Sequence, residues 1–133
     1  MKTVLLVDDD NTVLLGLGVR LKSMGYTVYT AKDAVNAVSA AVKNSPNVVV
    51  LDISLPAGDG FLVCERLQNL VSSAATPIIF MTASANPSLR DRAMKLGAAA
   101  FLTKPFDATT LADAIESALS PGDNWSPVVR RLS

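Results

Sequence analysis

Residues 4–10 read Val-Leu-Leu-Val-Asp-Asp-Asp, an apolar run that ends abruptly in three carboxylates. The run is apolar at every position and lacks the alternation of a strand with one face in water. This pattern predicts a strand covered on both faces, as in a parallel sheet between layers of helices. A second such run over residues 47–51, Asn-Val-Val-Val-Leu, leads directly into Asp52. We therefore expect two buried parallel strands with acidic side chains at their carboxyl ends.

Further apolar runs extend this pattern along the chain. The predicted strands are residues 3–7, 26–30, 47–51, 78–81 and 99–102. The second of them alternates between apolar and polar positions, which suits an edge strand. Helical patterns separate the runs, and strand–helix alternation favours right-handed crossovers. The sequence thus predicts an α/β fold, a doubly wound five-stranded parallel sheet with five helices covering both faces.

The predicted helices carry their own start and stop signals. The candidate N-terminal caps are Asp10 or Asn11 for the first helix, Asn86 before Pro87 for the fourth, and Asp107 for the fifth. Such side chains accept hydrogen bonds from the first free backbone N–H groups of a helix. Asp33 is expected in the first turn of the second helix. The third helix is predicted over residues 59–70, with Leu70 among its buried positions.

Composition and charge exclude several classes of protein. The chain has 133 residues, half of them hydrophobic, which suits one compact domain over residues 1–120 and a tail or the start of a linker over 121–133. The 12 basic and 12 acidic residues balance, so we expect no direct binding to nucleic acid. The lack of histidine removes serine–histidine and cysteine–histidine catalysis. Without a signal peptide or a membrane-spanning stretch, a cytoplasmic protein with no membrane contact is expected.

Polar side chains stand at the carboxyl ends of the predicted strands. Asp8 and Asp9 follow the first strand, and Asp52 follows the third. Thr82 comes at the end of the fourth strand, and Lys104 follows the fifth. These ends share one edge of an open α/β sheet, where ligands bind at the point of strand-order reversal. If the strand order is 2-1-3-4-5, the three carboxylates converge between the first and third strands, facing the lysine and the hydroxyl.

This combination of side chains indicates a phosphoryl group and a metal ion. Three carboxylates placed together repel one another unless a cation intervenes. An oxygen-only ligand set selects a hard ion, and Mg²⁺ suits a site with few protein ligands. An adjacent ammonium and hydroxyl can neutralise and bind phosphoryl oxygens, and an aspartate can be the nucleophile.

Four motifs then match one known family in the same order. They are residues 4–10, residues 52–60 (Asp-Ile-Ser-Leu-Pro-Ala-Gly-Asp-Gly), residues 81–83 (Met-Thr-Ala) and residues 101–106 (Phe-Leu-Thr-Lys-Pro-Phe). With these motifs the chain resembles the response-regulator receiver domains of two-component signalling systems, from about Lys2 to Leu119. The resemblance implies a flavodoxin-like receiver fold with the strand order 2-1-3-4-5.

The resemblance also implies the chemistry of the site. Asp52 matches the aspartate that accepts a phosphoryl group from the phosphohistidine of a sensor histidine kinase or phosphotransfer protein. Asp8, Asp9 and Asp52, with the backbone carbonyl of Ser54, match the ligands of the Mg²⁺ cofactor. Lys104 matches the lysine that pairs with the phosphoryl oxygens. Such a domain catalyses its own phosphorylation and dephosphorylation and turns over no external substrate.

Two further residues match the switch of the family. Thr82 matches the hydroxyl that moves toward the phosphoryl group, and Phe101 matches the aromatic side chain that swings inward behind it. The change reaches the face of the fourth helix, fifth strand and fifth helix, a possible contact for a homodimer or an effector domain. The family usually has a cis Lys-Pro bond, so the bond between Lys104 and Pro105 is expected to be cis.

Three other classes of protein share parts of this pattern. A haloacid-dehalogenase-like phosphatase needs a second aspartate two residues after its nucleophile, where this chain has Ser54. A flavin-binding module needs a phosphate-binding loop after the first strand, and the carboxylates of residues 8–10 would repel that phosphate. A pseudo-receiver, which binds partners without phosphorylation, usually lacks the acidic pair, the acceptor or the lysine. All of these are present in this chain.

Overall fold

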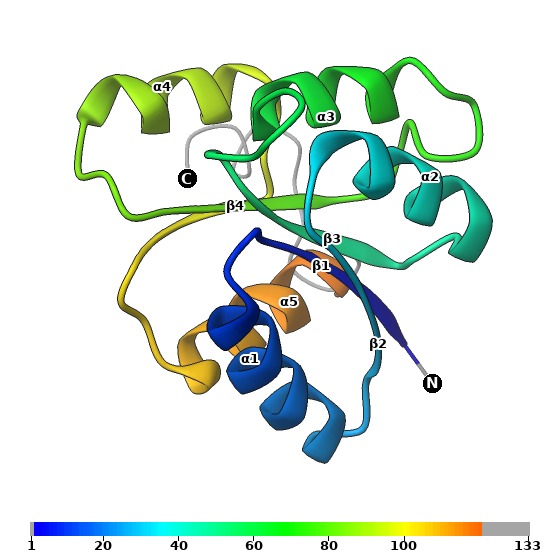
Figure 1. Ribbon diagram of the computed structural model, residues 1–133, viewed down its shortest axis with the longest axis vertical. Coiled ribbons are helices and arrows are strands. Elements are labelled where there is room, and N and C mark those ends of the chain that lie inside the picture. Colours follow the sequence, from blue (N-terminus) through cyan, green and yellow to red (C-terminus); the bar gives the residue numbers. More distant parts are fainter. Residues whose placement is uncertain (1, 121–133) are drawn as a thin grey trace.

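A computed structural model describes residues 2–120, which form a five-stranded parallel sheet with helices on both faces (Figure 1). The strands are β1 (Thr3–Val7), β2 (Thr27–Ala31), β3 (Val48–Asp52), β4 (Ile78–Thr82) and β5 (Ala100–Thr103). The helices are α1 (Asn11–Ser23), α2 (Ala34–Asn44), α3 (Gly60–Gln68), α4 (Pro87–Lys95) and α5 (Ala108–Leu119). The predicted tail over residues 121–133 lies outside the described residues.

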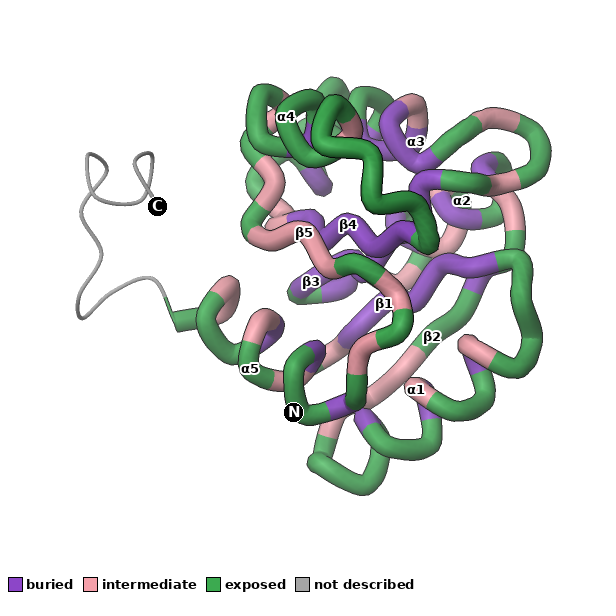
Figure 2. The backbone as a smooth tube through the Cα atoms, turned by 90° about the vertical axis from the view of Figure 1, so that its left-hand side faces the viewer, coloured by how far each residue is buried: buried purple, intermediate pink, exposed green. Residues whose placement is uncertain are grey.

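The strand order is β2-β1-β3-β4-β5, which confirms the predicted order and fold class. β1 pairs with both β2 and β3, so the order reverses between β1 and β3. β3 and β4 are buried along their whole length, whereas the edge strands β2 and β5 are partly exposed (Figure 2). This confirms the prediction that the alternating second strand lies at an edge. Among the helices over residues 2–120, none combines the length and the apolar character needed to cross a lipid bilayer.

The sheet separates two hydrophobic cores, because successive side chains of a strand point to opposite faces. In β1, Leu5 and Val7 belong to the core beneath α2, α3 and α4. Val4 and Leu6 belong to the core beneath α1 and α5. Figure 1 shows these two helical layers on opposite sides of the strands. The strands read as continuous apolar runs because both of their faces are covered.

Each helix begins at a side chain that accepts a hydrogen bond from the backbone of its first turn. The caps are Asp10, Asp33, Asp59, Asn86 and Asp107. Such a cap typically contributes about 0.5–2 kcal/mol to stability. Asp33 was predicted in the first turn of α2. It is instead the N-terminal cap, one position before that turn. The caps predicted for α4 and α5 are confirmed, and Asp10 is the one of the two candidates that caps α1.

The prediction for the third helix was wrong at its end. α3 ends at Gln68 and Asn69 is its C-terminal cap, so Leu70 lies beyond the helix. Leu70 is 36% exposed because it no longer shares the inward face of that helix. At the other end of α3, Phe61 is fully buried, with its ring centroid 5.1 Å from that of Phe80 on β4. The helix is therefore packed from its first turn, through Phe61, to its last, through Leu67.

Cys64 on α3 is buried, and we expect its thiol to be unreactive in the folded protein. Burial, with a smaller effect of Glu65, raises the pKa of Cys64 from 9.0 to about 11. Because only the thiolate reacts, alkylation by iodoacetamide at pH 8 should be at least about 100-fold slower in the folded than in the urea-unfolded protein. Intact mass against time measures both rates.

The same shift has a consequence at alkaline pH. A pKa raised by folding contributes stability below pH 9.0, and this contribution is lost as the pH rises toward about 11. Cys64→Ala should therefore lose less stability than the wild type across that interval. Equal alkylation rates in folded and unfolded protein would contradict the burial of this thiol.

Candidate functional site

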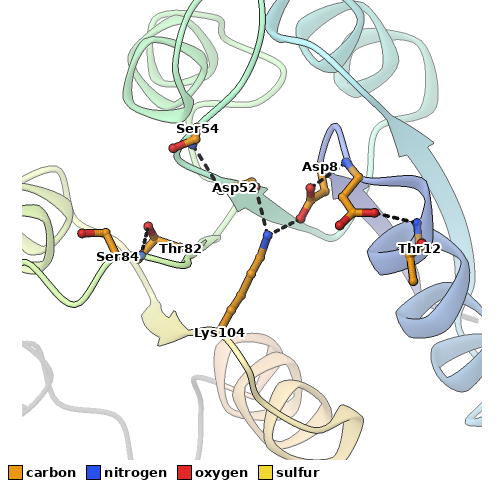
Figure 3. A network of polar contacts seen from close by, with 8 residues as sticks. Asp8, Thr12, Asp52, Ser54, Thr82, Ser84 and Lys104 are labelled. Carbon is orange, nitrogen blue, oxygen red and sulfur yellow. Dashed lines mark hydrogen bonds and ion pairs between the residues drawn. The ribbon is translucent and has the colours of Figure 1, made fainter.

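The site residues come from the carboxyl ends of four strands (Figure 3). Asp8 follows β1, Asp52 is the last residue of β3, and Thr82 is the last residue of β4. Lys104 follows β5, and its ammonium lies 2.6 Å from Asp8 Oδ2 and 3.0 Å from Asp52 Oδ2. One lysine thus bridges two carboxylates at the point where the strand order reverses. The predicted convergence of these residues at one sheet edge is confirmed.

The two bridged carboxylates are removed from solvent. Asp8 is fully buried and Asp52 is 5% exposed. Burial raises the pKa of Asp52, an effect that the hydrogen bond from Lys104 opposes and the charge of Asp8 reinforces; the net pKa is above its ordinary value. Burial lowers the pKa of Lys104, but its hydrogen bonds to Asp8 and Asp52 outweigh burial and the net pKa is raised. The side chain of Lys104 therefore stays protonated at neutral pH, and Asp52 ionises less readily than an exposed aspartate.

Backbone groups fix the orientation of both carboxylates. The N–H of Asp10 donates to Asp8 Oδ1 at 2.9 Å, and the N–H of Ser54 donates to Asp52 Oδ1 at 3.1 Å. Each carboxylate therefore presents one oxygen to its own loop and the other to Lys104. Over residues 2–120, every buried side-chain nitrogen and oxygen has a hydrogen-bond partner. The arrangement is held from both sides and does not depend on the lysine alone.

Asp9 completes an acidic cluster with Asp8 and Asp52. One oxygen from each of the three carboxylates lies within 4.8 Å of the others, and Asp9 is exposed while its neighbours are buried. Three hard oxygen donors gathered at one sheet edge suit a hard divalent cation. The residues present thus fit Mg²⁺, with water able to reach the site past Asp9. The side chain of the fourth predicted ligand residue, Ser54, is exposed beside Asp52.

The loop after Asp52 turns sharply through residues with unusual backbone conformations. Ala57 and Gly58 have φ angles of 61° and 116°. Gly60, the first residue of α3, donates its N–H to the Ile53 carbonyl at 2.7 Å. A Cβ at Gly60 would collide with the Asp52 carbonyl oxygen and lie 2.9 Å from Ile53 Cα. The start of α3 therefore packs directly against the backbone that carries the acidic side chain.

We expect Gly60→Ala to destabilise the protein by about 1–3 kcal/mol, because the added methyl group meets backbone atoms that cannot rotate away. The matched control is Gly16→Ala in α1, where an added Cβ meets nothing within 4 Å. That substitution should stabilise the helix by roughly 0.5–1 kcal/mol. Urea denaturation of both variants gives the two free energies of unfolding. Similar values for the two variants would show that the backbone around Asp52 yields to the extra methyl group.

Thr82 is 2% exposed and connects the site to α4. The N–H of Ser84 donates to Thr82 Oγ1 at 3.1 Å, and the N–H of Asn86 donates to Ser84 Oγ at 3.2 Å. The N–H of Ser88 in turn donates to Asn86 Oδ1 at 3.0 Å. These three bonds form a continuous ladder over residues 82–88, from the end of β4 into the first turn of α4. The ladder was not predicted from the sequence, although serine and asparagine at alternate positions permit it.

Phe101 lies apart from the carboxylates. It is half-buried on β5, pairs in register with Phe80 of β4, and packs against the core beneath α2, α3 and α4. The peptide bond between Lys104 and Pro105 is cis, as predicted. Beside it lies a cavity of about 330 Å³ that sequence reasoning missed, lined by residues 104–106 and by Thr12, Val13, Gly16 and Leu17 of α1.

Fold and site together define a doubly wound α/β protein with a lysine-bridged acidic cluster at its strand-order reversal. The chain belongs to the response regulator receiver domain family, whose model matches residues 4–116. It is accordingly a domain of two-component signal transduction. The family assignment from the four sequence motifs is confirmed.

Named relatives and solved structures agree with this assignment. The DNA-binding dual master transcriptional regulator RpaA of Synechocystis is 32% identical over 123 residues, which cover 92% of this chain and 51% of that protein. A putative response regulator of Chloroflexus aurantiacus has a TM-score of 0.84 at 32% identity, covering 90% of this chain and 98% of the other. The chemotaxis response regulator CheY4 of Vibrio cholerae has a TM-score of 0.83 at 29% identity, with coverage of 90% and 99%. The chain spans about half the length of the first curated relatives that it matches.

Proposed function

We propose that this chain is a phosphorylation-dependent switch that accepts a phosphoryl group on Asp52 in a Mg²⁺-dependent reaction. The observation that carries the proposal is the position of Lys104, whose ammonium contacts both Asp8 and Asp52 at the strand-order reversal. A lysine placed between two buried carboxylates can turn to the oxygens of a group bound to one of them. The proposed donor is the phosphohistidine of a sensor histidine kinase or phosphotransfer protein.

In the proposed reaction, a carboxylate oxygen of Asp52 attacks the phosphorus atom of the phosphohistidine. An oxygen–phosphorus bond forms, the nitrogen–phosphorus bond breaks, and the imidazole leaves with its electron pair. The Ser54 N–H holds one oxygen of Asp52 and thereby orients the other. Lys104 stabilises the charge on the transferred group, and the buried Thr82 hydroxyl donates a hydrogen bond to one of its oxygens.

Asp8, Asp9 and Asp52, with the backbone carbonyl of Ser54, would hold the Mg²⁺ ion, which when bound neutralises phosphoryl charge. The fit rests on the oxygen-only donor set of the cluster. Asp9, the exposed member, leaves one side of the site open to solvent and to the donor protein. The low exposure of Asp8 and Asp52 limits the access of other nucleophiles to the acyl phosphate.

The signal is proposed to leave through Thr82 and Phe101 toward the face of α4, β5 and α5. Movement of the Thr82 hydroxyl toward a phosphoryl group would alter the bond from Ser84, and with it the ladder into α4. Phe101 would then follow inward against the core that it already contacts. A second copy of the chain or an effector domain is the proposed reader of that face.

The function is tested with acetyl phosphate as donor. Intact mass should show the gain of one phosphoryl group in the presence of Mg²⁺ and none in the presence of a chelator. Borohydride reduction of the acyl phosphate, followed by peptide mass analysis, should place the group at Asp52. If acetyl phosphate gives no gain, a panel of purified phosphorylated histidine kinases is the second donor. Failure with both donors would mean that the chain is a pseudo-receiver, which binds partners without phosphorylation.

A further inference from the structure

The helix α4 is weakly embedded in the protein. Ala93 is its one buried residue, and Leu89 is half-buried. The other side chains of Pro87–Lys95 are exposed, so apolar burial contributes little to its position. The backbone of α4 contacts that of β5 more extensively than that of α3. The placement of α4 beside α3, visible in Figure 1, is therefore supported by Ala93 in the shared core and by side chains that span the two helices.

Two side-chain contacts span them. The guanidinium of Arg92 on α4 lies over the ring of Phe61 on α3, with Cζ 4.3 Å from the ring centroid. One turn further along α4 and about two turns further along α3, Gln68 Nε2 donates to the carbonyl oxygen of Leu96, the C-terminal cap of α4, at 2.5 Å. The first contact is a cation–π interaction, and the second satisfies a carbonyl that the helix itself leaves free. We name this pair of contacts the α3–α4 latch.

The latch is continuous with the residues proposed to switch. The ring of Phe61 packs against Phe80, and Phe80 is the register partner of Phe101 on β5. All three rings belong to, or pack against, the same hydrophobic core. At its other end, α4 is joined to Thr82 by the hydrogen-bond ladder over residues 82–88. A displacement of α4 that begins at Thr82 must therefore stretch or break the latch.

We infer that the α3–α4 latch holds α4 in the arrangement seen here and thereby sets the fraction of protein in the arrangement that favours a phosphoryl group on Asp52. The inference rests on the proposed function and assigns a regulatory role to Arg92 and Gln68. Neither residue touches the carboxylate site, so both act through the position of α4. Because binding and conformation are linked, an intact latch lowers the rate of phosphoryl acceptance.

The test uses the full chain with Arg92→Ala and Gln68→Ala. Alanine, arginine and glutamine all have high helix propensity, so the helices themselves are retained. Two quantities are measured: the amide hydrogen exchange of residues 88–96 without donor, and the initial rate of phosphoryl gain from acetyl phosphate with Mg²⁺. Each variant should raise both quantities roughly 2- to 5-fold, the effect expected from losing one exposed contact of this kind.

The matched control is Arg90→Ala, which removes an exposed arginine from the same helix and should change neither quantity. Arg92→Lys keeps the charge, loses the planar guanidinium, and should fall between the wild type and Arg92→Ala. It also tests the latch if Arg92→Ala fails to fold.

The outcomes separate the latch from the proposed function. Faster exchange with unchanged phosphorylation would overturn the regulatory role, and unchanged exchange would overturn the latch itself. Absence of phosphoryl gain in the wild type and every variant would instead remove the proposed function, and the regulatory role with it.

Discussion

Replacing Asp52 with asparagine should abolish the gain of a phosphoryl group from acetyl phosphate. An amide oxygen lacks the negative charge that makes the carboxylate a nucleophile. Asp8, the other carboxylate that contacts Lys104, is fully buried. The matched control is Asp59→Asn, the same substitution at the cap of α3, where asparagine caps equally well. Intact mass should show full modification of the control and none of Asp52→Asn. Modification of both variants would place the acceptor elsewhere.

The same variant should be more stable than the wild type at pH 7 in the presence of a chelator. Burial, together with the charge of Asp8, raises the pKa of Asp52 above its ordinary value of 3.8. A carboxyl group whose pKa is raised by folding favours the folded state below that ordinary value. This contribution is lost as the pH rises through the folded-state pKa. The stability that Asp52→Asn gains over the wild type should therefore grow as the pH rises from 3.8 to the folded-state pKa. Thermal unfolding midpoints of both proteins, measured in chelator between pH 3 and pH 7, test this.

Replacing Lys104 with methionine should have the opposite effect on stability and a large effect on the reaction. The apolar part of the side chain is kept, but Asp8 and Asp52 lose their shared hydrogen-bond donor. Loss of an ammonium aimed at developing charge typically slows a reaction by about 10²- to 10³-fold. We expect that reduction in the initial rate of phosphoryl gain, measured by intact mass with Mg²⁺ held constant.

The stability of Lys104→Met should depend on Mg²⁺. Without the ion, the unpaired buried carboxylates should cost roughly 1–3 kcal/mol of unfolding free energy. Saturating Mg²⁺ should restore most of this loss, because a cation bound by the same carboxylates replaces the missing charge. The control is Lys95→Met on the exposed surface of α4, for which neither effect is expected. If the unfolding free energy of Lys104→Met is the same with and without Mg²⁺, the acidic cluster does not bind the ion.

The fold and the composition of the site could be predicted from the sequence because both depend on local patterns. Runs such as residues 47–51 are apolar at alternate and intervening positions alike, so they indicate strands covered on both faces. The residue that follows each run then lies at the carboxyl edge of the sheet, which brings Asp8, Asp52 and Lys104 together. The helix caps could be predicted from local residue types, whereas the strand order was implied by the family resemblance.

The remaining features depend on packing between segments distant in sequence. Leu70 matches the helical period, yet α3 ends before it, because the backbone leaves the helix at Asn69. Arg92 reads as a solvated charge on a polar helix, and only the placement of α3 puts the Phe61 ring beneath its guanidinium. The cavity beside Lys104 likewise forms between α1 and residues 104–106, two segments far apart in the sequence. Periodicity and propensity contain no information about such pairings.

The division of the interior into two cores bears on how this chain could diverge in evolution. The core beneath α1 and α5 and the core beneath α2, α3 and α4 share few side chains, since the sheet lies between them. Residues that do not touch tend to contribute independently to stability. Mutations on the α4 side could therefore accumulate, and a new output contact be acquired, without compensating changes beneath α1. The acidic cluster lies at the edge of the sheet between the two cores. The chemistry of the site can therefore stay constant while the partner protein that contacts the α4 side changes.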